Sequence, residues 1–422
     1  MPLFKTFAST KPFDPRAFRL FPRFLYYLMA DRDREVLGIG VKAMVEASTA
    51  MDAMPMWRAF LDEQTGVTMG HATYGLKDGL ERLTSRHGDP FHRPIVRWFA
   101  PLVYAERVHG QWTLIFSPED EDFANEVLKA LGSPTEPPGT LLVPPTWTCS
   151  TDPTRYLEHA NTLMAHLRCG DIYELNYCIQ RTTSGSIWDP FAAGEMLLKN
   201  TGAPCASFYR WDEQYALCAS PERFLRFEQG QVWSEPMKGT RRRKDDPVED
   251  RIELDRLAED QKERAENIMA TDVVRNDLSR IAASGSVKVE ELCSVRSHRL
   301  VHQMVSNVSA VLRSGYQPLD AVQAAFPMAS MTGAPKLRAM QLIDEHEAHG
   351  RGLFSGTIGW LGPDRTGDLN VVIRTLEYDG RTGFSRLLTG SALTAACDPE
   401  REWEECALKA RSVLEAIGHA SA

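Results

Sequence analysis

Residues 205–234 read CASFYRWDEQYALCASPERFLRFEQGQVWS, and this stretch decides the fold class. Four short segments in it are rich in aromatic and aliphatic residues: Cys205–Trp211, Tyr215–Ala219, Phe224–Phe227 and Gln231–Ser234. The connections between them carry Asp, Glu, Pro and Gly residues and are too short to contain a helix. Because strands joined by such short connections pair antiparallel, the stretch predicts an antiparallel sheet.

The same kinds of segment continue on both sides of this stretch. Further strands are predicted at Ile172–Ile179, Val301–Leu312, Leu353–Leu361, Leu369–Tyr378 and Ser385–Gly390. Capping residues and apolar spacing predict helices at Glu121–Leu131, Thr151–Gly170, Asp250–Met269, Leu319–Phe326, Pro335–Glu347 and Pro399–Ile417. Groups of strands with helices between the groups indicate an α+β protein with mainly antiparallel sheets.

A proline-rich stretch, Ser133–Pro145, marks the clearest boundary in the chain. Proline and glycine cluster there, between two predicted helices, which is typical of a connection rather than of a helix or strand. We therefore expect an N-terminal portion, residues 1–145, and a C-terminal portion, residues 146–422.

The composition argues against several classes of protein. The chain has 422 residues, of which 43% are hydrophobic and 25% charged, so it is long enough to bury a large core. The net charge of −9 argues against a nucleic-acid partner, and no apolar run approaches the length that a membrane requires. The eight cysteines have no C-x-x-C spacing, which is typical of a reduced, cytoplasmic protein.

Two polar residues lie on predicted turns. Glu222 follows Pro221 between two strand candidates, and Lys238 lies in the turn candidate Pro236–Thr240. Three arginines, 241–243, follow directly. Burial and neighbouring cations lower the pKa of a lysine and free a neutral amine for nucleophilic or base chemistry. The alternative is a solvated lysine.

Two pairs of glutamates are candidates for a metal site: Glu263 with Glu266, and Glu402 with Glu405. A spacing of three residues puts both carboxylates of a pair on one face of a helix. Two such faces that converge would form the oxygen site that Mg²⁺ prefers. The alternative is two exposed helix faces, where such pairs are common.

Two further features suggest that an anion binds. The stretch Thr332–Lys336 runs into a predicted helix, whose free N–H groups can hold a carboxylate. Arg374 lies in the otherwise apolar segment Leu369–Leu376, where a cation needs an anion; an internal ion pair is the alternative. Together the candidates indicate a small substrate with carboxylates, a divalent cation, and an acid and an amine that act on the substrate.

Two other motifs do not predict a site. Gly38–Ala43 fits the pattern G-x-G-x-x-A but lacks the βαβ context that a dinucleotide site requires. The basic run 241–244 is followed at once by Asp245 and Asp246, which favours a solvated turn.

At these residues the sequence resembles the chorismate-utilising enzymes, from about Ser150 to Ala416. The segments that carry the resemblance are Pro236–Thr240, Glu263–Met269, Val274–Leu278, Val301–Ser306, Thr332–Lys336 and Trp403–Cys406. The resemblance is closest to the aminodeoxychorismate synthase component I branch, because anthranilate synthase component I, the next most similar branch, has alanine where this chain has Lys238. It implies two packed, mainly antiparallel sheets with outer helices and a site between the sheets.

The resemblance also implies a role for each candidate. Lys238 would attack C2 of chorismate while Glu222, the general acid, assists departure of the 4-hydroxyl; ammonia would then add at C4 and expel the lysine. Glu266 and Glu405, with Glu263 and Glu402 directly or through water, would hold Mg²⁺. Either His302 or Gln303 corresponds to a family active-site histidine. The implied substrate-binding residues are Thr240, Thr332, Gly333, Trp360, Arg374, Gly390, Ser391, Ala392 and Lys409.

Two positions depart from the family pattern. Trp360 stands where tyrosine is usual, and Gly390-Ser391-Ala392 stands where Gly-Ala-Gly is usual. Both departures concern substrate binding rather than the reaction class.

The chain has no glutaminase nucleophile motif, so the resemblance implies that a separate glutamine amidotransferase subunit supplies ammonia. Residues 1–145 would then contribute to the sheets and to the partner surface, and residues 146–422 would bind chorismate for 4-aminobenzoate and folate synthesis. The alternatives are an anthranilate synthase, an isochorismate or salicylate synthase, and a non-catalytic regulatory or binding subunit.

Overall fold

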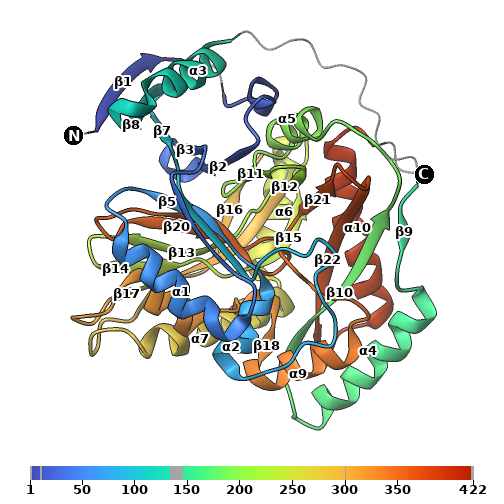
Figure 1. The fold of residues 1–422 in the computed structure, drawn as a ribbon. Coiled ribbons are helices and arrows are strands. Elements are labelled where there is room, and N and C mark those ends of the chain that lie inside the picture. Colours follow the sequence, from blue (N-terminus) through green and yellow to red (C-terminus); the bar gives the residue numbers. More distant parts are fainter. Residues whose placement is uncertain (1, 10–11, 134–145, 300, 420–422) are drawn as a thin grey trace.

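The computed structural model describes residues 2–9, 12–133, 146–299 and 301–419. Most of the expected boundary at Ser133–Pro145 lies outside these residues. Within them, two large sheets are surrounded by helices, and every pairing between neighbouring strands is antiparallel (Figure 1). The predicted α+β class with packed antiparallel sheets is confirmed.

The first sheet has twelve strands in the described residues and takes strands from both sides of residue 145. Its order is β1-β8-β7-β3-β2-β11-β12-β21-β22-β10-β18, and β9 pairs with β10. The strands are β1 (Leu3–Ala8), β2 (Arg23–Met29), β3 (Arg34–Ile39), β7 (Val103–Val108), β8 (Gln111–Phe116), β9 (Thr148–Cys149), β10 (Glu174–Thr183), β11 (Ser207–Trp211), β12 (Gln214–Cys218), β18 (Gly333–Ala334), β21 (Thr375–Asp379) and β22 (Phe384–Thr394).

The second sheet has ten strands among the same residues and is also built from both portions. Its order is β15-β17-β14-β13-β20-β19-β5-β6-β4, and β16 pairs with β17. The strands are β4 (Ala43–Ala47), β5 (Thr68–Ala72), β6 (Val96–Ala100), β13 (Arg223–Glu228), β14 (Gln231–Ser234), β15 (Met237–Arg242), β16 (Lys288–Ser297), β17 (Val301–Val311), β19 (Thr357–Leu361) and β20 (Gly367–Asn370).

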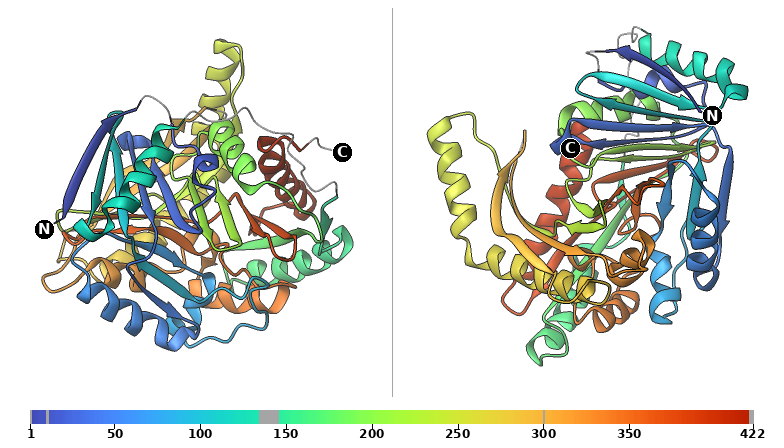
Figure 2. Two further views of the ribbon diagram at one scale, coloured as in Figure 1. Left: turned by 45° about the horizontal axis from the view of Figure 1, so that its top comes forward. Right: turned by 90° about the vertical axis from the view of Figure 1, so that its left-hand side faces the viewer.

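Helices pack on the outside of both sheets. In the right-hand view of Figure 2, α6 and α7 lie on the side of the molecule opposite the N-terminal strands. The helices are α1 (Ala50–Glu63), α2 (Lys77–Glu81), α3 (Glu121–Gly132), α4 (Pro153–Arg168), α5 (Pro190–Thr201), α6 (Pro247–Glu259), α7 (Gln261–Ser279), α8 (Pro318–Ala325), α9 (Lys336–His346) and α10 (Pro399–Ala416).

One predicted helix, Asp250–Met269, is in fact two. Asp260 has extended backbone angles, so it ends α6 and begins α7. Its side chain accepts hydrogen bonds from the backbone N–H groups of Lys262 and Glu263. An acceptor at this position satisfies N–H groups that a new helix leaves free, which the charge pattern alone does not reveal.

One predicted strand, Leu369–Tyr378, is also two. β20 belongs to the second sheet and β21 to the first, and Val371–Arg374 crosses between them. A second crossing, Ala219–Glu222, leads from β12 in the first sheet to β13 in the second. These two crossings, which run in opposite directions, are two of the places where the described chain passes from one sheet to the other.

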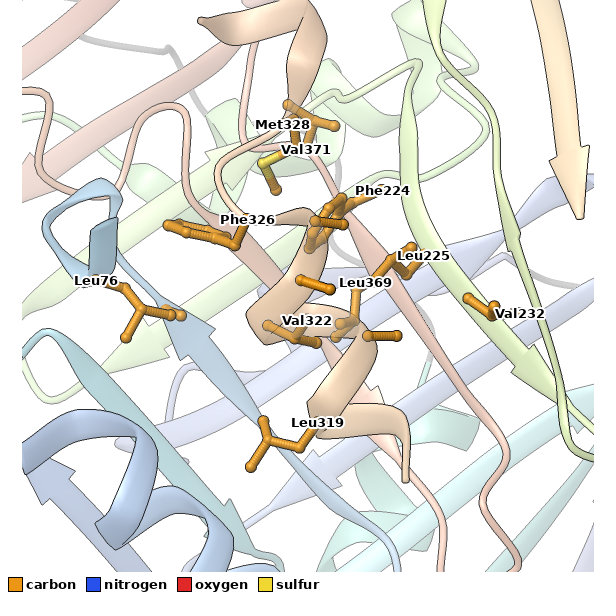
Figure 3. Close-up of a cluster of buried hydrophobic side chains, with 14 of the residues drawn as sticks. Leu76, Phe224, Leu225, Val232, Leu319, Val322, Phe326, Met328, Leu369 and Val371 are labelled. Carbon is orange, nitrogen blue, oxygen red and sulfur yellow. The ribbon is translucent and has the colours of Figure 1, made fainter. Parts of the chain in front are cut away.

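Apolar side chains fill the space beside these crossings. Figure 3 shows part of a cluster in which Phe224 and Val371 lie close to Phe326 and Met328, next to helix α8. A separate cluster joins the two sheets and contains Leu25, Met69, Phe99, Tyr209, Ile358, Trp360 and Val372. Burial of this kind is the main favourable contribution to folding, and it holds the crossings in place from two sides.

Candidate active site

The two crossings lie against each other and present Glu222 and Arg374 to the same region. The N–H of Val371 donates to the carbonyl of Glu222 at 3.0 Å, and the hydroxyl of Ser220 donates to the carbonyl of Val371 at 2.6 Å. The N–H of Ala219 donates to the carbonyl of Arg374 at 3.2 Å. These bonds fix both segments without using the Glu222 carboxyl or the Arg374 guanidinium.

Glu222 is buried next to a small cavity with apolar walls. Phe224, Val274, Met328 and Val371 line this cavity together with Glu222. Burial raises the pKa of Glu222 to about 7, although the hydroxyl of Ser330 donates to its carboxyl at 2.6 Å and favours the charged form. A carboxyl with this pKa holds a proton near neutral pH and can act as a general acid.

Arg374 is not part of a strand, contrary to the prediction. It lies at the end of the crossing with φ of 50°, the left-handed region. Burial lowers the pKa of its guanidinium, and Glu222 is the one nearby charge that opposes this shift. Within the described residues, the guanidinium has no ion pair or hydrogen bond, so it is free to meet an anion.

Lys238 lies in strand β15, not on a turn as predicted. Lys238 pairs with Met304 of β17 and Thr240 pairs with Gln303, so Gly239 is the extra residue of a β-bulge. Gly239 has φ of +75°, and a Cβ there would come within 2.9 Å of the Glu263 Oε2 atom. Gly239 therefore forms a bulge that re-aims the strand beside Lys238.

Polar residues of the sequence motifs hold the start of β15. Asn267 of α7 donates to the carbonyl of Pro236 at 3.4 Å, and the N–H of Ser306 in β17 donates to the same carbonyl at 3.0 Å. The hydroxyl of Ser306 donates to the Asn267 side chain. Two motif residues that carry no chemistry of their own thus fix the backbone two residues before Lys238.

The surroundings of Lys238 are anionic, which reverses the predicted direction of its pKa. Burial alone lowers this pKa, but the negative charges of Glu174, Glu266 and Glu222 outweigh burial and raise it above the ordinary value. The arginines that were expected to lower it point elsewhere: Arg241 pairs with Glu253 and Asp260, and Arg243 pairs with Asp250. The resting lysine is therefore charged.

The four predicted metal ligands come from α7 and α10, which face one another through Lys262. The Lys262 amine lies 2.9 Å from Glu402 Oε1 and 3.7 Å from Glu266 Oε1. Glu266 is buried, its Oε1 atom has no hydrogen-bond partner, and burial raises its pKa to about 7. In the described part of the chain, no three acidic, histidine or cysteine side chains are already close enough to enclose a metal ion.

Glu263 and Glu405 belong to the same acidic region. Burial raises the pKa of Glu263, and the nearby charge of Glu405 adds to this rise. Burial also acts on Glu405, but Lys409, 2.6 Å away, outweighs it and lowers the pKa. The Lys409 amine also donates to the Gly390 carbonyl at 2.9 Å.

The predicted substrate-binding residues around β18 and β22 lie on or next to two strands that pair with β10, the strand of Glu174. Gly333 pairs with Leu175 of β10, and a Cβ at Gly333 would lie 2.0 Å from the Glu174 carbonyl oxygen, so only glycine fits. The hydroxyl of Thr332 donates to the Met328 carbonyl. Ser391 is buried with its hydroxyl on the Glu402 carbonyl, and Ala392 pairs with Asn176.

Trp360 lies apart from these residues. Its indole is buried in the cluster that joins the two sheets, with the Arg34 guanidinium 4.6 Å from its ring centre. Its indole nitrogen has no hydrogen-bond partner in the described structure. Trp360 therefore packs in the core rather than beside Glu222 or Lys238, because the alternation of β19 turns its side chain towards the other sheet.

The remaining predicted residues, Thr240, His302 and Gln303, lie on the paired strands β15 and β17. Thr240 is exposed on β15. His302 is buried between the Ser297 hydroxyl at 2.8 Å and Asp250 at 3.0 Å, so both ring nitrogens are used. The next residue, Gln303, is buried, and its Oε1 atom has no hydrogen-bond partner in the described structure. Gln303 is therefore more available than His302 to bind a substrate.

Sequence reasoning missed Glu174, Ser330 and Arg351. Glu174 contacts Lys238, and Ser330 contacts Glu222. Arg351 is buried and donates to the carbonyls of Met331 and Asn176, which fixes the segment before Thr332. The signal for Glu174 was a carboxylate inside the apolar strand candidate Ile172–Ile179, which alternation alone assigns to a solvated face.

Comparisons with known proteins assign the chain to a family. The chain matches the family model of chorismate binding enzymes over residues 24–415. It therefore belongs to this family. Of the described residues, no helix has both the length and the apolar character needed to cross a bilayer.

The similar curated proteins include aminodeoxychorismate synthases and an anthranilate synthase component. Aminodeoxychorismate synthase of Streptomyces griseus is 40% identical over 275 residues, 63% of this chain and 38% of that protein. Aminodeoxychorismate synthase component 1 of Klebsiella aerogenes is 36% identical over 301 residues, 71% of this chain and 65% of the relative. Anthranilate synthase component 1 of Thermus thermophilus is 33% identical over 368 residues, 85% of this chain and 78% of the relative. The chain thus spans less than two thirds of the length of the first two.

A solved structure shares the whole fold. The menaquinone-specific isochorismate synthase from Escherichia coli superposes with a TM-score of 0.80 at 18% identity, covering 99% of this chain and 94% of that chain.

Proposed function

We propose that the chain converts chorismate and ammonia to 4-amino-4-deoxychorismate through a covalent adduct on Lys238. The observation that carries the proposal is the placement of Lys238 and Glu222. A buried amine from the second sheet and a buried carboxyl from the crossing lie close enough for the charge of each to shift the pKa of the other. An amine and a protonated acid that lie this close to each other suit a displacement in which a hydroxyl leaves.

Each residue has one task in the proposed reaction. Glu222, with its raised pKa, gives its proton to the departing 4-hydroxyl, which leaves as water. The unpaired guanidinium of Arg374 and the amine of Lys409 bind substrate carboxylates. Ammonia then bonds to C4 and the lysine leaves as a neutral amine.

Mg²⁺ fits the glutamates of α7 and α10. Carboxylate oxygens are the ligands it prefers, and the buried Oε1 atom of Glu266 has no hydrogen-bond partner in the described structure. Glu266 and Glu405, with Glu263 and Glu402 directly or through water, would hold the ion. When bound, it supplies positive charge that neutralises a substrate carboxylate.

The proposed nitrogen source is a separate amidotransferase subunit. Relatives called component 1 support this, because a component implies a second one. Ammonium salts replace such a partner in a test of the isolated chain.

A single assay tests the reaction. The purified chain is incubated with chorismate, Mg²⁺ and ammonium at alkaline pH, and the product is identified by mass and chromatography. Aminodeoxychorismate is expected. Anthranilate, isochorismate or an absence of turnover would each contradict the proposal and favour one of the other classes.

The Lys238→Ala variant tests the covalent step. We expect kcat for aminodeoxychorismate to fall by about 10³-fold, since the nucleophile is lost. Lys199→Ala, on the outside helix α5, is the matched control and should keep the parental rate. Aminodeoxychorismate formation by Lys238→Ala at the parental rate would exclude the adduct.

A further inference from the structure

The carboxylate that contacts Lys238 comes from the opposite sheet. Glu174 is the first residue of β10 in the first sheet, and Lys238 is in β15 of the second. The Lys238 amine donates a hydrogen bond to the Glu174 Oε1 atom. Only 4% of the Glu174 side chain and 9% of the Lys238 side chain are exposed, so the pair lies between the sheets with little access to water.

Glu174 is held rigidly enough to keep this contact. It pairs with Thr394 of β22 on one side and with Ala334 of β18 on the other. Gly333 of the same strand, β18, approaches the Glu174 carbonyl so closely that a Cβ there would lie 2.0 Å from its oxygen, so β18 packs tightly against β10. A side chain that starts from the middle of three strands has little freedom to move away from the amine.

The amine of Lys238 needs a proton acceptor if it is to act as a nucleophile. The anionic surroundings keep it charged at rest, and an ammonium group has no lone pair to give. Among the residues that the structure describes, only Glu174 offers an acceptor within hydrogen-bonding distance of the Lys238 nitrogen.

Other charged groups face Lys238 without contacting it. Glu222 faces it from the crossing, but its carboxyl is bonded to Ser330 and has the task of protonating the leaving group. Glu266 and Glu263 on α7, and Glu405 on α10, interact with Lys238 through their charge alone and are the candidate metal ligands. Contact with the amine therefore singles out Glu174.

We propose that Glu174 is a catalytic residue that accepts the proton which the Lys238 amine loses before it bonds to the substrate. This inference rests on the proposed function, because it assigns a partner to the nucleophile of that reaction.

The proton balance closes over one cycle. Transfer converts the ammonium–carboxylate pair into a neutral amine and a neutral carboxylic acid. The N–C2 bond then forms as the C4–O bond breaks, and Glu222 supplies the proton that turns the departing hydroxyl into water. When ammonia bonds to C4, the C2–N bond breaks, and the neutral lysine amine takes its proton back from Glu174. The new C4 ammonium group returns a proton to Glu222.

The Glu174→Gln variant keeps the size and the hydrogen-bond acceptor but cannot take a proton. We expect kcat with chorismate and ammonium to fall by about 10²-fold or more, with KM for chorismate changed by less than about threefold.

The pH profile separates proton transfer from a structural role. Transfer inside the pair does not change the net protonation of the site, whereas the Gln variant must release the lysine proton to solvent. The ratio of parental kcat to variant kcat should therefore fall about tenfold for each pH unit until the lysine of the variant is neutral. Because both enzymes share Glu222, its titration cancels in the ratio.

Two further variants complete the kinetic test. Glu174→Asp retains a carboxylate, so it should recover part of kcat and show a ratio that does not change with pH. Glu158→Gln, exposed on α4, is the matched control and should behave as the parent. A Glu174→Gln variant with kcat within about threefold of the parent, or with a pH-independent ratio, would overturn the proposal.

A second measurement does not depend on turnover. Competitive acetylation by acetic anhydride, read by mass spectrometry, reports the fraction of Lys238 that is a free amine. Removing the anionic partner lowers the pKa of Lys238, so its labelling at pH 8 should rise by about tenfold or more in Glu174→Gln. Unchanged labelling would contradict the contact between Glu174 and Lys238. If the parental enzyme were inactive on chorismate, the proposed function would be contradicted, but the labelling experiment would still report on this contact.

Discussion

Two buried groups of charges lie between or beside the sheets, and they differ in balance. The first, which we call the arginine cluster, consists of Arg93, Arg386, Asp89 and Glu377. The second, the lysine cluster, consists of Lys238, Glu174, Glu222 and Glu266. In the arginine cluster each carboxylate lies within ion-pair distance of a guanidinium, whereas in the lysine cluster Lys238 faces three carboxylates and, among the described residues, contacts only Glu174.

The two clusters also differ in the hydrogen bonds that their buried side chains make. Arg386 is fully buried, and its guanidinium bonds to Glu377 at 2.7 Å and to the carbonyls of Gly350 and Arg351. In the lysine cluster Glu266 Oε1 has no hydrogen-bond partner in the described structure and lies 3.7 Å from the Lys262 amine, and two carboxyls have their pKa raised to about 7. A balanced cluster stabilises the fold by itself, whereas an unbalanced one is completed by protons, metal ions or substrate.

The Glu377→Gln variant should show the largest effect on stability. It leaves two buried guanidiniums with a single carboxylate, and breaking such a pair costs about 3–5 kcal/mol of unfolding free energy. The same change in the surface pair of Glu228 with Arg32 should cost less than about 1 kcal/mol. Chemical denaturation of both variants measures the difference in unfolding free energy. Equal losses of unfolding free energy would show that the buried arginine cluster stabilises the fold no more than a surface ion pair does.

The Glu222→Gln variant should have the opposite effect, and only at high pH. The folded pKa of about 7 lies above the ordinary value of 4.5, so the ionised carboxyl costs stability as the pH rises from about 4.5 through 7. Glutamine removes this cost, so the variant should gain about 2 kcal/mol at pH 8 and almost nothing at pH 4.5. Unfolding curves at the two pH values test this, and a gain that is independent of pH would contradict it.

Added Mg²⁺ should produce the smallest effect. Binding to the folded state alone raises Tm, and we expect about 1–3 °C at saturating concentrations. Glu266→Gln should abolish the rise, while Glu158→Gln should retain it. A rise that survives in Glu266→Gln would place the ion elsewhere.

Much of the fold was predictable because local patterns carry it. The strand Gln231–Ser234 and the helix that begins after Asp152 have the predicted bounds or cap, since alternation, proline and capping residues act within a few positions. The split at Asp260 was missed because the charge pattern of a helix does not show where one helix ends and the next begins. The split at Val371–Arg374 was missed because an apolar segment looks the same whether it stays in one sheet or crosses to the other.

For the candidate site, too, some features were predictable from the sequence and others were not. Residue type and spacing were enough to name Glu222, Lys238 and the four glutamates as candidates, and their roles stay predictions. The pKa direction of Lys238 was wrong, since the neighbouring arginines in the sequence bond to α6 and the carboxylates that face the amine come from distant segments. Trp360 was placed with the substrate, but its side chain faces the core.

The order of residues along the chain was enough to predict the α+β class and the family and to name a candidate amine and a candidate acid, because short-range patterning and residue chemistry carry this information. Folding in three dimensions decided which charges meet. Glu174 and Lys238 are 64 positions apart and lie in different sheets, so only the packing of those sheets brings them into contact. The electrostatics of a buried group depend on its neighbours in space, which the linear sequence does not contain.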